Sequence, residues 1–582
     1  MNITYKAITS DAFQGLVSKD GQVLVDGLKT ANEGLRIIDV TGDGLKDIVI
    51  ATVGDPALPI QPNDPATDVL IAKADGTFTL ADTDELRATG WLNDFIFLDS
   101  DGDGTLEIVG IDSGREVDVG NPEFFSRLHV FEYDSAQNKF INLENSPVNN
   151  NPGFFHNASN SADLNLDELP DFVVAQMGPK NFQIYLGDES SVFVESTKDI
   201  LGESYNEITG TWNGAKYIAA GAAGVIDYRG DGDWDVLILP YTAQSWSHNR
   251  LFGQILEFEN GEFVEDHLFN VRDFDGVSLP DDWGYSFFSV NDLNNDGLLD
   301  VLALVETASV IGSSIFVSMI QNKSGGFDLM PAFPDEELIT PRNGDLVAGY
   351  VWHEYKVNLE DLDGDGDLDL YWGQWFGGSQ EYFSDGVFLN NGEGLFFRNT
   401  AFADALEQQI TWSSNGGATS TMADLNYDGI GDFIILQDVW SGATQHSVIP
   451  KIYLSETDVS SDSNTIKFNG LRAYYELERV GDSLVVTDQQ YVDGKLTLDD
   501  SVKRVSFSDV SVALDTEGAT SAGGIYRLYK AAFNREPDTG GLGYWIAQAD
   551  ADNKDAVRMA EDFTWSAEFQ NLYGITTKDN YG

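Results

Sequence analysis

The chain of 582 residues carries 33 Lys and Arg against 96 Asp and Glu, a formal charge of −63, and it has six His and no Cys. Nucleic-acid-binding proteins neutralise phosphates with clustered Lys and Arg, so this composition excludes a nucleic-acid partner and argues against docking on an anionic membrane. The lack of Cys excludes disulfides, thiolate metal sites and a cysteine nucleophile, whereas 42% hydrophobic and 12% aromatic residues indicate a folded chain.

The length predicts about two to four domains. No apolar stretch reaches about 18 residues, so no membrane-spanning helix is expected. Residues 1–30 lack a basic start followed by an apolar run, and no Sec-type signal peptide is therefore expected.

The first element is an alternating segment, residues 2–8, that precedes a set of internal repeats. An isolated strand leaves its backbone hydrogen-bonding groups without partners. We therefore expect this segment to pair with the last repeat and to join the two ends of the repeat region.

A nine-residue acidic frame returns seven times along the chain. The first copy is Asp39-Val-Thr41-Gly-Asp43-Gly44-Leu-Lys-Asp47, and later copies start at residues 99, 163, 227, 292, 361 and 424. Successive starts differ by 60, 64, 64, 65, 69 and 63 residues, which is too even for chance acidic clusters. One structural unit is therefore predicted to occur seven times.

Each frame offers oxygen donors at positions 1, 3, 5 and 9, and in most copies Gly at position 6 permits a sharp turn. One short loop with such donors can wrap a hard cation, and the backbone carbonyl of position 7 adds a ligand. Calcium accepts 6 to 8 oxygens in flexible geometry, whereas magnesium requires a tighter octahedron, so calcium is predicted. Acidic turns also form for backbone reasons alone, but turn chemistry does not require donors at four fixed offsets in seven copies.

Up to seven calcium ions are expected, each held by the ligands of one loop. The predicted ligands, at positions 1, 3, 5, 7 and 9, are Asp39, Thr41, Asp43, Leu45 and Asp47; Asp99, Asp101, Asp103, Thr105 and Glu107; Asp163, Asn165, Asp167, Leu169 and Asp171; Asp227, Asp231, Asp233 and Asp235; Asp292, Asn294, Asp296, Leu298 and Asp300; Asp361, Asp363, Asp365, Asp367 and Asp369; and Asp424, Asn426, Asp428, Ile430 and Asp432.

Two loops depart from this pattern. In the fourth, Arg229 stands where a ligand belongs, and its guanidinium is expected to pair with Asp227 and Asp231 in place of the cation. In the third, Glu168 stands at the Gly position, which demands a positive φ at a cost of about 1 kcal/mol, so a distorted loop is expected.

Most frames are followed at once by an apolar run of strand length, as in Ile48-Val49-Ile50 and Phe433-Ile434-Ile435. Further strands follow in each unit, for example Val69-Leu70-Ile71 before a Gly-containing turn. With a strand before the acidic loop, each unit supplies four short antiparallel strands, the content of one propeller blade. The predicted fold is mainly β: a seven-bladed β-propeller over residues 1–455, then a linker with a small β unit over 456–516, then a helical domain over 517–582.

The repeats resemble the FG-GAP or VCBS repeats of integrin α-chain propellers and of many bacterial extracellular proteins. The resemblance covers roughly residues 1–455 and rests on the acidic frames quoted above. It implies a calcium loop between the first two strands of each blade, on one rim of the disc.

The tail changes pattern twice. Alternating segments at 474–480, 484–487, 495–498 and 504–514 predict a small β unit, which weakly resembles the β segments beside haemolysin-type calcium-binding regions. From about residue 522 the apolar period is helical, and Tyr544 and Trp545 are expected to lie in that core. Residues 534–545 and 565–569 resemble a helical module of unknown function common at the C-termini of secreted bacterial proteins, which implies export by a C-terminal route such as type I secretion.

These features favour a secreted or cell-surface protein that recognises a glycan or an extracellular protein. Candidate aromatic loops are Trp283-Gly284-Tyr285, residues 350–353 and residues 372–376, since such side chains stack on sugars and anchor protein partners. Alternatives are a surface-layer or matrix assembly component and a secreted hydrolase or lyase. No Gly-x-Ser-x-Gly, His-Glu-x-x-His or phosphate-binding motif is present, and a non-enzymatic role is expected.

Overall fold

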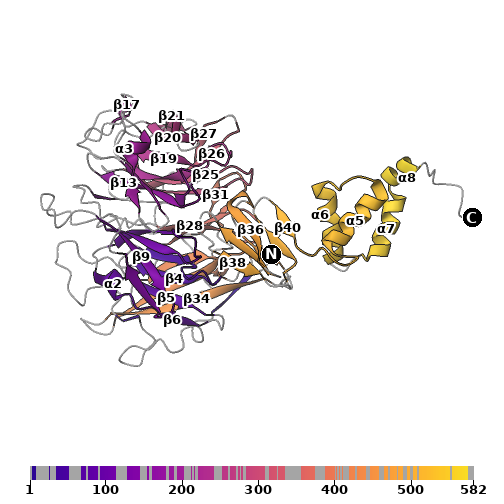
Figure 1. The fold of residues 1–582 in the computed structure, drawn as a ribbon, viewed down its shortest axis with the longest axis horizontal. Helices are drawn as coiled ribbons and strands as arrows, with labels where there is room; N and C mark the ends of the chain where they lie inside the picture. Colours follow the sequence, from indigo (N-terminus) through magenta and orange to yellow (C-terminus); the bar gives the residue numbers. More distant parts are fainter. Residues whose placement is uncertain are drawn as a thin grey trace, which may run out of the picture. The chain divides into compact units, whose positions relative to one another are not determined.

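A computed structural model gives the fold (Figure 1). It is mainly β, with many small antiparallel sheets and a few C-terminal helices, as predicted. The described residues are 3–7, 25–26, 34–51, 67–73, 77–88, 92–112, 127–143, 154–155, 160–177, 182–188, 193–201, 211–212, 215–216, 220–240, 252–259, 262–270, 273–274, 277–278, 283–307, 314–323, 325–333, 356–373, 387–399, 402, 405–406, 409, 418–425, 429–440, 446–457, 465–468, 472–480, 483–488, 495–498, 502–507, 510–550 and 554–573.

Six of the seven repeats each supply four antiparallel strands that pair in sequence order, and the seventh supplies three strands to a sheet that β1 completes. The acidic frame always connects the first strand to the second. The strands of the seven sheets are β3 (Gly34–Ile38), β4 (Asp47–Ala51), β5 (Asp68–Ala72) and β6 (Phe78–Leu80); β7 (Leu92–Leu98), β8 (Glu107–Asp112), β9 (Arg127–Asp134) and β10 (Lys139–Asn142); β12 (Ser161–Ala162), β13 (Asp171–Met177), β14 (Phe182–Leu186) and β15 (Val194–Glu195); β18 (Ala220–Ile226), β19 (Asp235–Pro240), β20 (Phe252–Glu259) and β21 (Glu262–Asn270); β24 (Trp283–Asn291), β25 (Asp300–Thr307), β26 (Ser314–Gln321) and β27 (Phe327–Pro331); β28 (Lys356–Glu360), β29 (Asp369–Gly373), β30 (Val387–Asn390) and β31 (Phe396–Phe397); and β32 (Ala418–Ala423), β33 (Asp432–Trp440) and β34 (His446–Thr457), completed by β1 (Ile3–Ala7).

Smaller elements accompany these sheets. They are β2 (Val25–Asp26) beside β34, β11 (Phe154–Phe155) beside β13, the hairpins β16 (Thr211–Trp212) with β17 (Ala215–Lys216) and β22 (Asp273–Phe274) with β23 (Val277–Ser278), and the short helices α2 (Asp84–Ala88) and α3 (Thr197–Leu201).

The N-terminal strand completes the last sheet. β1 runs antiparallel to β34, with Ile3 opposite Thr457 and Ala7 opposite Tyr453. Residues more than 440 positions apart thus share one sheet, and the predicted pairing of the first segment with the last repeat is confirmed. This pairing supplies hydrogen-bond partners to a strand that would otherwise be an open edge.

The second strand of each repeat is the centre of its packing. In the first repeat, Ile48, Val49 and Ile50 are all buried, with at most 3% of their surface exposed, because apolar side chains cover both faces of this strand. A continuous apolar run after each acidic frame is the sequence pattern that this burial requires. Burial of one such side chain is worth about 1.5–3 kcal/mol.

The hydrophobic clusters join each sheet to its neighbour. Val49 of the first sheet packs in one cluster with Phe131 of the second, and other clusters join the second to the third, the third to the fourth, the fifth to the sixth and the sixth to the seventh. Tyr228 and Phe327, with ring centroids 5.9 Å apart, connect the fourth and fifth repeats. Ile48 shares a cluster with Ile434 of the seventh sheet, so the packing order of the sheets is cyclic.

The chain divides into two compact units, and the predicted segment 456–516 contributes to both of them. Residues 1–461 and 469–498 form the first unit, and residues 462–468 and 499–582 form the second. In the first unit, the 3-10 turn η4 (Arg472–Tyr474) precedes a sheet of β36 (Tyr475–Val480), β37 (Ser483–Asp488) and β38 (Lys495–Leu498). In the second, β35 (Thr465–Lys467) pairs in parallel with β39 (Arg504–Ser506), which pairs with β40 (Ser511–Ala513).

One strand expected in the tail is in fact two. The pattern at 504–514 predicted a single strand, but the chain turns between β39 and β40, where the Phe507 N–H donates to the Val510 carbonyl. The strands predicted at 474–480 and 484–487 are confirmed as β36 and β37, which pair antiparallel.

Four helices end the described chain: α5 (Ala522–Phe533), α6 (Thr539–Asp550), α7 (Ala556–Trp565) and α8 (Ala567–Tyr573). Tyr529, Phe533 and Phe563 form their core, and Trp545 packs edge-on against Phe563 at 5.0 Å. The expectation that Tyr544 also lies in the core is wrong, because this side chain points outward and the residue is 55% exposed. In the described residues we find no helix that is both long enough and apolar enough for a membrane span.

Candidate metal sites

The same hydrogen bond shapes all seven acidic loops. The carboxylate at position 1 accepts the backbone N–H of position 6, at 2.7 Å between Gly44 and Asp39 and at up to 3.2 Å in the other loops. Position 6 has a positive φ in every loop, from 70° at Glu168 to 96° at Gly366. The predicted sharp turn at position 6 is therefore present throughout.

The side chain at position 9 has a second role that was not predicted from the sequence. In the sixth loop Asp369 is 1% exposed, and its Oδ2 accepts the N–H of Leu362 at 2.9 Å while its Oδ1 accepts the N–H of Asn390 at 2.7 Å. Four other loops repeat this pair of bonds, with the second donor again at or just beyond the third strand. Position 9 thus fastens the loop to its own sheet. The signal in the sequence was the apolar residue that directly follows each position 9, which places position 9 at the start of a buried strand.

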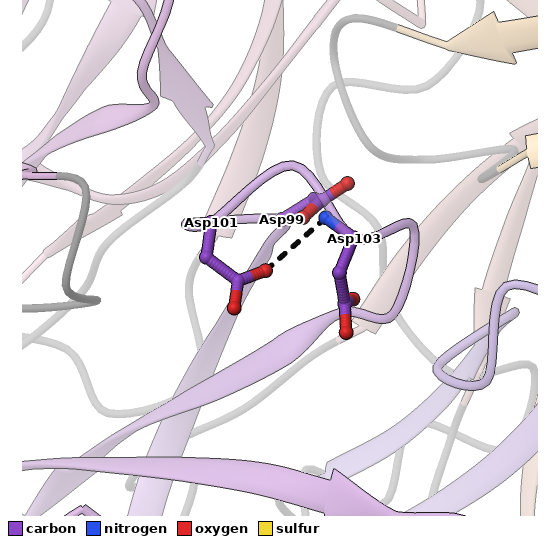
Figure 2. A group of neighbouring side chains, drawn as sticks. All are labelled: Asp99, Asp101 and Asp103. Carbon is purple, nitrogen blue, oxygen red and sulfur yellow. Dashed lines mark hydrogen bonds between the residues drawn. The ribbon is translucent and has the colours of Figure 1, made fainter.

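Two loops bring acidic oxygens into tight groups. Asp99, Asp101 and Asp103 of the second loop (Figure 2), and Asp361, Asp363 and Asp369 of the sixth, each place one carboxylate oxygen from every member within 4.8 Å of the others. Among the described residues these are the two acidic groups of this kind. Like charges held so close repel one another unless a cation or protons neutralise them.

Both groups contain a buried oxygen without a hydrogen-bond donor. Asp99 Oδ1 and Asp363 Oδ1 are buried, and among the described residues neither accepts a hydrogen bond. A buried carboxylate oxygen without a donor is costly, and a cation supplies the missing interaction. The donor set is made of hard oxygen atoms, so these two loops fit calcium better than a soft transition metal.

Burial also raises the pKa of the loop carboxylates. Desolvation is the largest cause, and it raises the pKa of Asp369 to about 8, that of Asp171 to about 7 and that of Asp300 to about 7. Backbone N–H donors oppose this shift, while neighbouring carboxylates add to it. Without a cation, a larger fraction of these groups is therefore protonated near neutral pH than of an ordinary Asp.

The two departures from the frame behave differently from expectation. Arg229 does not pair with Asp227 or Asp231; its guanidinium donates to Glu257 Oε1 at 2.7 Å, and its φ is 81°. Glu168 does adopt a positive φ, yet its N–H still donates to Asp163 Oδ2 at 2.8 Å. The third loop therefore keeps the hydrogen bonds of the other loops, and the expected distortion is absent from them.

Other predicted residues are placed as follows. In the seventh loop, Asp424 and Asp432 make the same hydrogen bonds as their equivalents in other loops, whereas Asn426 and Asp428 lie outside the described residues. Trp283-Gly284-Tyr285, expected in a loop, forms the start of strand β24, with Trp283 opposite Thr307. Residues 350–353 and 374–376 also lie outside the described residues.

Neighbouring loops touch one another. The Asn295 side-chain amide at position 4 of the fifth loop donates to Asp367 Oδ1 of the sixth loop at 2.8 Å. Position 4 of the first loop, Gly42, abuts the carbonyl of Gly104 in the second. Position 4 also has a positive φ wherever the structure describes it, a requirement that was not predicted although Gly occupies this position in four frames.

Comparisons with known sequences identify only the C-terminal part. A family model described as a domain of unknown function, DUF4214, matches residues 514–580, and this confirms the predicted helical module. No FG-GAP or VCBS repeat model matches the repeats. A search of curated proteins gives no match.

Several solved structures are distantly similar. The exotype rhamnogalacturonan lyase YesX is 12% identical, with 91% of this chain and 80% of that chain covered and a TM-score of 0.30. The V. cholerae biofilm matrix protein Bap1 is 13% identical, with 88% and 76% covered and a TM-score of 0.24. A Photorhabdus luminescens Tc holotoxin pore is 13% identical at a TM-score of 0.31, and the match covers 77% of this chain but 18% of the toxin chain. Similarities this low carry no inference about the activity or ligand of this chain.

Proposed function

We propose that this chain is an extracellular, calcium-stabilised recognition protein built on a seven-bladed β-propeller. The single observation that supports calcium best is the pair of buried carboxylate oxygens, Asp99 Oδ1 and Asp363 Oδ1, that lack a donor among the described residues and lie inside grouped acidic loops. The propeller is supported by seven four-stranded sheets, their cyclic packing order and the completion of the last sheet by β1.

Calcium binding would also relieve charge repulsion. Each ion adds +2, so seven ions would change the net charge from −63 to −49 (−63 + 14). The loops then stabilise the fold only where calcium is abundant, which favours a role outside the cytosol. The absence of Cys and the C-terminal DUF4214 module agree with export by a C-terminal route.

Recognition is proposed at the ends of the sheets opposite the acidic loops. Trp283 is the first residue of β24, whose other end leads into the fifth loop, while Trp372 and Trp440 lie at the far ends of β29 and β33, which begin at position 9 of their loops. Topology thus places three tryptophans at one end of their sheets. Indole rings stack on sugar faces and anchor protein partners, so a glycan or a surface protein is the proposed ligand.

The decisive test is thermal unfolding of the purified chain in chelator and across a calcium titration, with magnesium as control and bound metal counted. We expect a large calcium-specific rise in Tm and about five to seven ions per chain. A Tm that does not change with calcium would overturn the metal proposal. Glycan-array binding would support recognition, whereas calcium-dependent self-association without glycan binding would favour a matrix-assembly role.

A further inference from the structure

The fourth acidic loop differs from the other six in how its charges are satisfied. Arg229 occupies position 3, and its guanidinium contacts Glu257 at 2.7 Å and lies 3.2 Å from His267 Nε2. Glu257 is a buried residue of β20, so the Arg229 charge is matched by the sheet and not by the loop. The Arg229 N–H is also engaged, because it donates to the side chain of Gln321 in the fifth repeat. Arg229, which stands at a ligand position of the frame, therefore makes these hydrogen bonds with residues outside the fourth loop.

The position-1 carboxylate of this loop has an unusual partner. The Tyr474 hydroxyl donates to Asp227 Oδ2 at 3.2 Å, across 247 residues of sequence. Both residues are buried, with 4% of Asp227 and 7% of Tyr474 exposed. The Trp234 ring of the same loop lies 5.4 Å from the Tyr474 ring. Tyr474 therefore contacts two residues of the fourth loop: Asp227, which accepts its hydrogen bond, and Trp234, whose ring lies beside its own.

Tyr474 belongs to a segment with a particular place in the chain. It ends η4 and directly precedes β36, in the stretch 469–498 that belongs to the first unit. This stretch is inserted between residues 462–468 and 499–582, which together form the second unit. The chain therefore changes from one unit to the other at three points, after residues 461, 468 and 498. The last two points border the segment that contains Tyr474.

We infer that the fourth loop is a docking point for the β36–β38 sheet and not a cation site, with Tyr474 as its anchor. The hydrogen bond between the Tyr474 hydroxyl and Asp227 is buried, so its loss leaves a buried polar group that water cannot reach. It gives the position-1 carboxylate of the fourth loop a side-chain donor from outside the repeats. The repeat that has lost its position-3 ligand is the one that holds the inserted sheet.

The test is hydrogen–deuterium exchange of the full chain, followed by mass spectrometry, on Tyr474→Phe and Asp227→Asn. We expect the amides of β36–β38 to exchange about tenfold faster or more in both variants, while β3–β6 stay unchanged. The matched control is Tyr133→Phe, which removes a tyrosine hydrogen bond to Asn138 at 2.8 Å in the second repeat. All variants are compared in one calcium-containing buffer, so the result does not depend on how many other loops bind ions.

Faster exchange of β36–β38 in Tyr474→Phe and Asp227→Asn, but not in Tyr133→Phe, supports docking through the fourth loop. Equal exchange in Tyr474→Phe and Tyr133→Phe overturns it. A count of bound calcium in Asp231→Ala provides the second arm: an unchanged count is expected, and the loss of one ion would show that the fourth loop is a cation site after all.

Discussion

A Cβ atom on Gly42 would lie 1.8 Å from the carbonyl oxygen of Gly104, so the first and second acidic loops touch backbone to backbone. Gly42 has a φ of 66°, and Gly102, the equivalent residue of the second loop, has a φ of 74°. A Cβ atom on Gly102 would meet no described atom within 4 Å. The two glycines therefore share backbone conformation and differ in the space around them, which makes them a matched pair.

We expect Gly102→Ala to lower the free energy of unfolding by about 1 kcal/mol, the cost of left-handed backbone for a residue with a Cβ. Gly42→Ala should lower it by about 1–3 kcal/mol more, because the backbone of the second loop must move. Urea unfolding of both variants measures the difference. Equal losses would mean that the loops do not restrain one another.

A second prediction separates structural carboxylates from ligands. Asp369→Ala leaves the buried N–H groups of Leu362 and Asn390 without acceptors, so we expect a loss of about 2–4 kcal/mol with or without calcium. Asp365→Ala in the same loop removes an exposed side chain and should cost less than about 0.5 kcal/mol in chelator, but part of the calcium stabilisation should vanish. Urea titrations in both buffers test this. A calcium-independent loss in Asp365→Ala would contradict it.

A third prediction concerns the count of bound ions. Asp363→Ala removes the buried oxygen that lacks a donor in the sixth loop, and we expect one calcium fewer per chain and a lower Tm in calcium. Equilibrium dialysis with metal analysis gives the count. Leu362→Ala, which changes the neighbouring buried residue without removing a donor oxygen, is the control for general destabilisation and should keep the full count.

A fourth prediction follows from the raised pKa values of the buried loop carboxylates. The pKa of Asp369 is about 8 and those of Asp171 and Asp300 are about 7, all above the ordinary 3.8, so in this window the folded state binds more protons than the unfolded state. The stability that these groups contribute is therefore full below about pH 4 and is lost as the pH rises toward about 8. In chelator, we expect the chain to be more stable at pH 5 than at pH 7.5.

The repulsion among all exposed acids acts in the same direction, so a variant must isolate the buried groups. Asp369→Asn should reduce the slope of stability against pH, whereas Asp365→Asn should leave the slope almost unchanged. Urea unfolding across this pH range, in chelator, provides the measurement. Identical slopes in the two variants would show that the buried carboxylate is not responsible.

Local rules of chain geometry made much of this fold predictable. The acidic frame that starts at Asp39 predicts a turn, and Ile48-Val49-Ile50 predicts a strand that is buried on both faces. The repeated unit can therefore be predicted from residues that are close together in the sequence. The pairing of residues 2–8 with the last repeat was predictable for a different reason, since an unpaired strand needs hydrogen-bond partners. The helical period after residue 522 similarly predicted α5 and α7.

Other features depended on contacts between distant residues. Position 9 appeared in the sequence as one more ligand, but its role as an acceptor requires the N–H of Asn390, 21 residues away in the third strand. Arg229 was expected to pair with the nearest acids, yet it contacts Glu257, which lies 28 residues away in β20. The split of 456–516 between two units was also hidden, because alternation specifies a strand but not its partner.

The sequence by itself determined the acidic loops, the seven repeats, the strands between them and the C-terminal helices, because turn chemistry and apolar periodicity act over a few residues. Only the tertiary structure decided which loops gather their oxygens, which carboxylates fasten strands, and why the fourth loop meets Tyr474. Those outcomes depend on burial and on donors brought close by folding, and a carboxylate cannot reveal from its neighbours in sequence whether it will face a cation, an N–H or a phenol.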